Sequence, residues 1–132
     1  RAPAGGRRRG GEQQKESPMG DGQTTRTENV VRTGIVAELP LVAESIVSRI
    51  LVDNDLLQVT QFTFGAGQTL SEHTSSRAAV VQVLEGELVF RLNGEDNLLR
   101  AGDCLYMAPD TPHSVRAETD CRMALVLVDP QG

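Results

Sequence analysis

Short runs of alternating apolar and polar residues follow one another from residue 30 to the end of the chain. Gly, Pro, Asn and Asp separate these runs at intervals of roughly eight residues, a rhythm typical of antiparallel strands. Asn93-Gly94 between two alternating runs is the strongest hairpin signal. The pattern predicts strands over residues 29–37, 45–52, 56–64, 68–73, 79–84, 87–92, 97–100, 104–107, 113–117 and 122–128. Only residues 41–48 could form a helix, and their periodicity is weak.

This sequence of short strands predicts an all-β fold, either an antiparallel sandwich or a barrel. A jelly-roll barrel, or double-stranded β-helix, suits a folded part that runs from residue 30 to residue 132. One side of each strand would fill the barrel and leave a pocket at one mouth.

The first 29 residues differ from the rest, because they contain many Gly and charged residues and almost no apolar ones. Such a segment cannot bury enough surface to offset its conformational entropy, so we expect a disordered tail over residues 1–29. Arg7-Arg8-Arg9 is not followed by an apolar stretch, which argues against a twin-arginine export signal. A nucleic-acid arm is the less favoured alternative to an expression remnant or a start site placed too early, with Met19 as the true start.

The composition of the chain excludes some classes of function. Its 132 residues are enough for one domain. Residues 30–132 carry seven arginines against fourteen acidic residues, so a nucleic-acid partner is not expected. Aromatic residues make up 3% of the chain, too few for base-stacking platforms. No apolar run is long enough to span a membrane, and we expect a cytoplasmic protein. Cys104 and Cys121 are expected to be buried free thiols rather than a disulfide.

The chain has two histidines, His73 and His113, and each lies at a strand edge beside a turn. Imidazole is a common ligand of transition metals near neutral pH. Gly67, His73, Ser75, Ala79 and Gly86 follow one spacing, and Gly102, Pro109 and His113 follow a second. These two motifs resemble those of the cupin superfamily, specifically its small single-domain conserved-barrel (type-2) proteins. The resemblance covers about residues 45–128 and implies the jelly-roll barrel.

The cupin resemblance also implies a metal site, which in this family is usually made by three histidines and a glutamate. His73 and His113 stand at the first and last ligand positions, but Ser75 and Ala79 replace the second histidine and the glutamate. The implied site therefore holds a divalent transition metal such as Zn, Fe, Mn or Ni through two histidines. Glu72 and Gln82 are candidates to complete it, although strand alternation turns both away from the interior.

Strand alternation also predicts which side chains line the interior. We expect an apolar pocket, with the two imidazoles and Ser75 at its mouth, that binds a small organic ligand. The candidate lining residues are Ser75, Phe62, Phe64, Val81, Phe90, Met107 and Met123, each of which could instead simply pack the core. Arg77 could bind an anion at the mouth, although an ion pair with a surface acid is the favoured role. Asp103 follows Gly102 and is expected to stabilise the turn by accepting backbone hydrogen bonds.

Three functions remain compatible with these residues. The first is a metal-dependent enzyme of the dioxygenase, isomerase, cyclase or decarboxylase type. The second is a metal-free protein that binds a small molecule, and the third is a regulatory or structural module. The cupin resemblance further implies a homodimer, in which residues 30–37 would form the strand that crosses to the partner.

Overall fold

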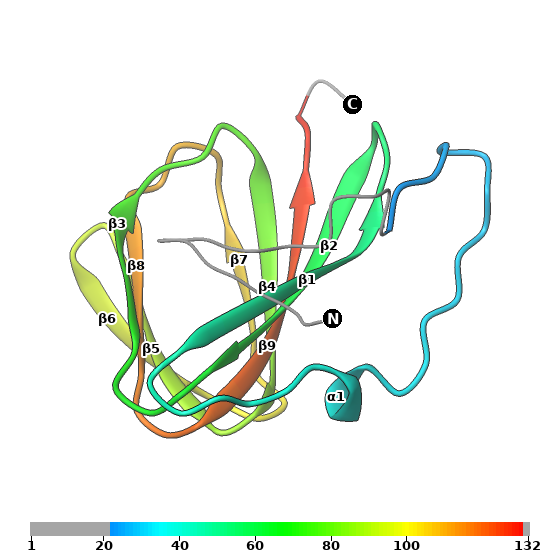
Figure 1. Cartoon of the computed structure of the whole chain (residues 1–132). Coiled ribbons are helices and arrows are strands. Elements are labelled where there is room, and N and C mark those ends of the chain that lie inside the picture. The colour runs from blue at the N-terminus through cyan, green and yellow to red at the C-terminus, as the bar shows by residue number, and fades with distance from the viewer. Residues whose placement is uncertain (1–21, 131–132) are drawn as a thin grey trace.

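The computed structural model describes residues 22–130, which form two antiparallel sheets and a single helical turn (Figure 1). The first sheet contains five strands in the order β1-β2-β9-β4-β7, and the second contains four in the order β3-β8-β5-β6. The elements are α1 (Ile35–Glu38), β1 (Ile46–Asp53), β2 (Leu57–Phe64), β3 (Thr69–His73), β4 (Ala78–Glu85), β5 (Glu87–Leu92), β6 (Glu95–Arg100), β7 (Cys104–Met107), β8 (His113–Ala117) and β9 (Cys121–Val128). The predicted all-β jelly-roll barrel is confirmed.

The two sheets enclose an apolar core, because each strand directs every second side chain inward. The largest fully buried apolar side chains include Phe64, Phe90, Leu88 and Met123. Ala79, Val81 and Val83 share the inner face of β4, and Val115 lies beside His113 on the inner face of β8. The predicted alternation of inward-facing and outward-facing positions is therefore confirmed over these strands.

The predicted hairpin at Asn93-Gly94 is also present. β5 and β6 pair from Glu87↔Arg100 to Leu92↔Glu95, so only Asn93 and Gly94 connect them. Both residues have positive φ, 52° and 83°. A two-residue loop with two positive φ angles matches the right-handed twist of the strands, which explains the preference for Asn-Gly.

Two predictions before β1 are wrong. Residues 30–34 form no strand and Ile35–Glu38 is a helical turn, while the weak helix expected over residues 41–48 is replaced by the start of β1 at Ile46. The physical reason is that this segment covers part of the outer face of the first sheet, over β2 and β9. Its carbonyl oxygens accept hydrogen bonds from Gln61, Thr63 and Arg122, at Ile35, Pro40 and Leu39 respectively. We call residues 30–45 the N-terminal strap.

The tail that we expect over residues 1–29 falls partly outside the described residues, because the structure does not describe residues 1–21. Residues 22–29 lie along the end of β1, where Thr24 donates its N–H to the Asp53 carbonyl oxygen at 2.9 Å. Arg26 forms an ion pair with Asp55 at 2.8 Å. No helix among the described residues is long and apolar enough to cross a membrane.

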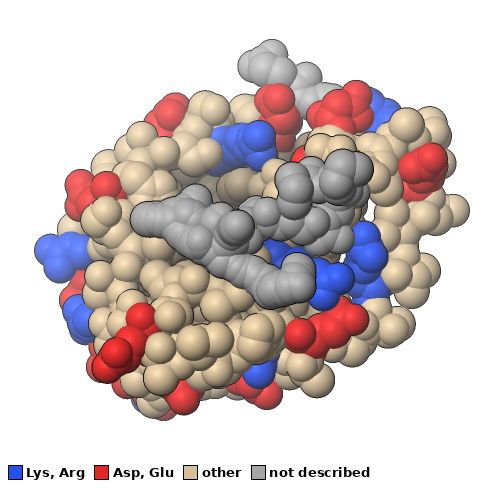
Figure 2. Space-filling model, viewed as in Figure 1, with Lys and Arg blue, Asp and Glu red and all other residues tan. Residues whose placement is uncertain are grey.

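Both cysteines are free, as predicted, but only Cys121 is buried. Cys104 is exposed, because it takes the outward position of β7 next to inward-facing Leu105. The turn role of Asp103 is confirmed, since its carboxylate accepts the Arg100 N–H at 2.8 Å. Acidic and basic side chains alternate around the periphery of the face shown in Figure 2.

Candidate functional site

His73 and His113 meet across two neighbouring strands, although they are far apart in the sequence. They are direct cross-strand partners at the ends of β3 and β8. Their ring centroids lie 4.1 Å apart, with the ring planes inclined by 60°. The structure therefore brings the two predicted histidines together at one end of the barrel.

A β-bulge in β3 places His73 on the inner face. Leu70 pairs with Val115 and His73 pairs with His113, so β3 spans three residue steps where β8 spans two. Without the extra residue, strand alternation would turn either Leu70 or His73 outward. The bulge lets both face the interior, and it leaves Ser71 and Glu72 to line the outer face of the second sheet.

Each imidazole is oriented by the same local contact. The Nδ1 atom of His73 lies 2.8 Å from the Ser71 carbonyl oxygen, and that of His113 lies 2.8 Å from the Thr111 carbonyl oxygen. A carbonyl oxygen only accepts, so Nδ1 carries a proton in both rings, and in the neutral form of each ring the free lone pair is on Nε2. Metal-binding histidines are commonly oriented by such a backbone contact.

The two rings differ in exposure. His113 is 6% exposed and stacks on Phe90 with a centroid distance of 5.9 Å, whereas His73 is exposed. Burial lowers the pKa of His113, and the charge of His73 lowers it further. The Thr111 carbonyl and the Glu72 carboxylate oppose this shift. The net lowering favours a neutral ring, which is the form that can accept a proton or bind a cation.

The other candidate ligands do not join the histidines. Ser75 lies in the loop between β3 and β4, where its hydroxyl accepts the N–H of Arg77 at 3.2 Å, and Ala79 is fully buried. Glu72 lines the outer face and Gln82 is exposed on β4, as strand alternation predicted. Residues 22–130 contain no group of three or more His, Cys, Asp or Glu side chains that could hold a metal ion. The donor set present is therefore two imidazoles.

Most of the predicted lining residues are fully enclosed in the core. Phe64, Val81, Phe90, Met107 and Met123 are buried, whereas Phe62 is only partly buried and lies 6.0 Å from Phe64 between ring centroids. The inward-facing side chains that remain partly exposed are Ile46, Phe62, Leu70, Leu92, Leu99, Leu105, Leu125 and Leu127. Of these, Leu92 and Leu127 lie at the histidine end of the barrel, as the cross-strand partners of His113 and Ala79.

The expected ion pair of Arg77 is not present among the described residues, in which no acidic side chain contacts its guanidinium. Arg77 is partly buried in the loop that follows β3.

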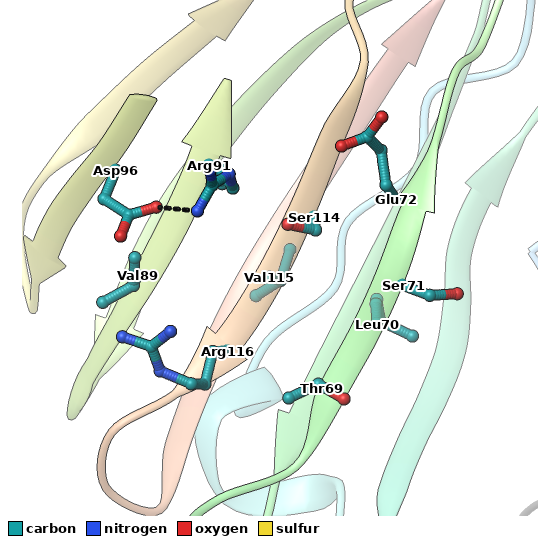
Figure 3. A pocket seen from close by; sticks show the side chains of 10 residues that line it. All are labelled: Thr69, Leu70, Ser71, Glu72, Val89, Arg91, Asp96, Ser114, Val115 and Arg116. Atoms are coloured by element: carbon teal, nitrogen blue, oxygen red, sulfur yellow. Dashed lines mark hydrogen bonds and ion pairs between the residues drawn. The ribbon is translucent and has the colours of Figure 1, made fainter. Parts of the chain in front are cut away.

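Sequence reasoning also missed a depression of about 290 Å³ on the outer face of the second sheet (Figure 3). Arg91, Arg116, Glu72 and the small residue Ser114 line it, and Arg91 contacts Asp96 at 3.4 Å. It lies on the opposite face of the sheet from the histidines. Its cause is the short side chain of Ser114 between longer ones, a feature that only the cross-strand register reveals.

Comparison with known proteins identifies the family. A family model for the cupin domain matches residues 60–129, which is more than half of the chain. The protein belongs to the cupin family. No curated protein matches this cupin significantly.

Several solved structures share the cupin's fold. A conserved protein of unknown function from Streptococcus pyogenes is 27% identical, with a TM-score of 0.72 over 80% of this chain and 92% of its own. A cupin 2 conserved barrel domain protein from Leptotrichia buccalis is 32% identical, with a TM-score of 0.65 over 67% of this chain and 43% of its own.

The salicylate 1,2-dioxygenase of Pseudoaminobacter salicylatoxidans is 24% identical, with a TM-score of 0.62 over 68% of this chain. The matched region is 28% of the dioxygenase chain. At this identity the likeness shows a shared fold and carries no substrate to this cupin.

Proposed function

We propose that this cupin binds a small organic ligand at the end of its barrel where His73 and His113 meet, assisted by a divalent transition metal on these two histidines. The observation that carries the proposal is the shared orientation of the two rings. Each donates Nδ1–H to a backbone carbonyl at 2.8 Å, which leaves Nε2 as the ring nitrogen available to a ligand, and the ring centroids lie 4.1 Å apart. Such fixed tautomers are what a pair of metal ligands requires.

The two imidazoles correspond to two of the four metal ligands that the cupin resemblance implies. When bound there, the metal would supply a positive charge that polarises an oxygen atom of the ligand. The two rings would hold the ion, and Ser75 and Ala79 would leave its other positions to solvent or ligand oxygens. The partly exposed apolar residues Leu92 and Leu127, which pair with His113 and Ala79 on neighbouring strands, would contact the rest of the ligand. Such a centre could serve a dioxygenase, isomerase, cyclase or decarboxylase.

Metal analysis of protein purified without added metal tests this proposal. We expect about one Zn, Fe, Mn or Ni ion per wild-type chain, since metal affinity needs both rings. His73→Ala and His113→Ala should each lose the ion. Glu72→Gln, which changes an exposed acid on the outer face, should retain it.

A variant with an added metal ligand gives a second test, which does not depend on how much metal the protein retains during purification. Ser75→His places an imidazole at the position where the cupin family has its second histidine. We expect this variant to bind Zn²⁺ about tenfold more tightly or better, because a third protein ligand completes a typical open site. A folded Ser75→His protein that binds Zn²⁺ no better than wild type would contradict the metal proposal.

A metal-free ligand-binding protein is the second candidate, and the absence of a third metal-binding side chain near the pair among residues 22–130 favours it. In that case the two Nε2 atoms would accept hydrogen bonds from the ligand directly. Binding of a small molecule to metal-free protein, with unchanged affinity after Zn²⁺ is added, would select this candidate. Loss of that binding in His113→Ala would then locate the ligand at the pair.

A further inference from the structure

We propose that Arg77 binds the carboxylate of the ligand, so that this cupin takes small organic acids rather than neutral molecules. The inference rests on the proposed function, because it assumes that a small molecule binds at the histidine end of the barrel. It adds the chemical class of that molecule and the residue that selects it.

Arg77 differs from every other arginine among residues 22–130, because its side chain has no hydrogen-bond or ion-pair partner there. The other seven contact Asp55, the Leu51 carbonyl, Glu38, Asp96, Glu87, Glu118 and Glu85, at distances from 2.6 to 3.4 Å. Residues 30–132 carry twice as many acidic residues as arginines, so partners for arginine are plentiful. Because acidic partners are plentiful, an arginine whose side chain has no partner is unusual in this domain.

The loop that contains Arg77 is held next to the histidine pair. It begins directly after His73, and its Ser75 carbonyl oxygen accepts the Asp110 N–H at 2.7 Å. Asp110 belongs to the turn that leads into His113. The Arg77 N–H in turn contacts the Ser75 hydroxyl at 3.2 Å. These contacts tie the loop that contains Arg77 to the turn before β8, beside the histidine pair.

Arg77 lies in the bend directly before β4, and it is partly buried there. Ala79, two residues later, is fully buried on the inner face, whereas Ala78 between them is only partly buried. Residues two apart in an extended chain share a side, and the proposed role places Arg77 on the side of Ala79. The partial burial of Arg77 agrees with this placement.

The chemistry of the histidine end suits an organic acid. Ala79 and Ser75 supply no negative charge at the two motif positions between the histidines. A guanidinium presents several N–H donors in a planar fork that matches a carboxylate. The partly exposed apolar residues nearby would contact a hydrocarbon or aromatic body, so the favoured ligand is a monocarboxylate with such a body.

Paired acids and amides test the proposal, because each pair differs mainly in charge. The probes are salicylate and salicylamide, benzoate and benzamide, and butyrate and butyramide, with binding followed by calorimetry and by the shift in melting temperature. We expect wild type to prefer the acid in at least one pair. Arg77→Gln should weaken acid binding about tenfold or more and leave amide binding unchanged, as expected for a charged hydrogen bond.

Two further variants complete the test. Arg77→Lys should restore part of the preference, because it keeps the charge and loses the planar fork. Arg91→Gln removes an arginine that pairs with Asp96 on the outer face, and it should bind acids like wild type. If Arg77→Gln keeps the full preference, or wild type binds amides as tightly as acids, the role of Arg77 is refuted while ligand binding stands. If none of the six compounds binds wild type, the role of Arg77 and the proposed function both fall.

Discussion

At the scale of single residues, the orientation of the candidate site depends on two backbone carbonyls. Ser71 and Thr111 each lie two residues before a histidine, and each accepts that histidine's Nδ1–H. The same relation therefore occurs on two strands that pair side by side. Because a backbone atom supplies the contact, no side-chain substitution at Ser71 or Thr111 removes the acceptor. The orientation should tolerate changes at both positions.

The two cysteines give a prediction at this scale. Burial raises the pKa of the Cys121 thiol to about 11 from an ordinary value of 9.0, whereas Cys104 is exposed. Only the thiolate reacts with alkylating reagents. We therefore expect iodoacetamide at pH 8 to modify one cysteine per chain, identified as Cys104 by peptide mass mapping. Cys104→Ser should abolish the reaction until the chain is unfolded.

The same shift has a consequence for stability. Between pH 9 and pH 11 the unfolded chain loses the Cys121 proton while the folded chain keeps it, so the free energy of unfolding falls as pH rises through this window. Cys121→Ala, measured by denaturant unfolding at several pH values, should have a shallower slope there than wild type. An equal slope in both proteins would mean that Cys121 does not contribute to the pH dependence of the free energy of unfolding.

At the scale of elements, the strands follow from the sequence but the bulge in β3 does not. Alternation in Ala79–Leu84 and Glu87–Leu92 predicts inward positions that the structure confirms. The extra residue between Leu70 and His73 has no local signal, because it arises from pairing with β8. The strap was misread for a related reason. Its β-branched residues favour a strand, yet Gln61, Thr63 and Arg122 hold it by single side-chain contacts across the sheet.

Two glycines in turns make a matched pair for testing close packing. Gly86 and Gly94 have similar positive φ angles, 79° and 83°. A Cβ atom at Gly86 would overlap the Asp120 carbonyl oxygen and approach the Cβ of Cys121 to 2.7 Å, whereas one at Gly94 would meet nothing within 4 Å. We expect Gly94→Ala to cost about 1–2 kcal/mol through its left-handed backbone alone.

Gly86→Ala should cost clearly more than Gly94→Ala, because backbone atoms must move to admit the methyl group. Urea unfolding of the two variants beside wild type measures the difference. Equal losses of stability would show that the β4–β5 turn can relax around Asp120, contrary to this expectation.

At the scale of the whole molecule, the homodimer stays a prediction, and the outer face of the first sheet indicates where it would form. Val59, Val126, Val80 and Tyr106 are successive cross-strand partners across β2, β9, β4 and β7. Tyr106 is 64% exposed, and none of the four is charged. A second copy related by a two-fold axis along the strands would set the large Tyr106 ring over the smaller Val59 of the partner subunit.

Light scattering after size exclusion tests this surface. Tyr106→Asp should convert a dimer to a species of 14.2 kDa, because it places a charge within the apolar row. Leu98→Asp changes an exposed apolar residue on the second sheet and should leave the mass unchanged. A wild-type mass of a single chain at micromolar concentration would count against the dimer.

Because of the strap, the folding unit begins earlier in the chain than the family match does. The cupin family match starts at residue 60, within β2, yet Leu39, Val47 and Leu51 are buried in the layer formed by the strap and β1. A fragment cut to the matched boundaries would uncover these apolar contacts and leave the edge of β2 open to pairing with other chains. Sequence-defined boundaries would thus yield an aggregating fragment, whereas one beginning near Gly22 would keep its outer layer.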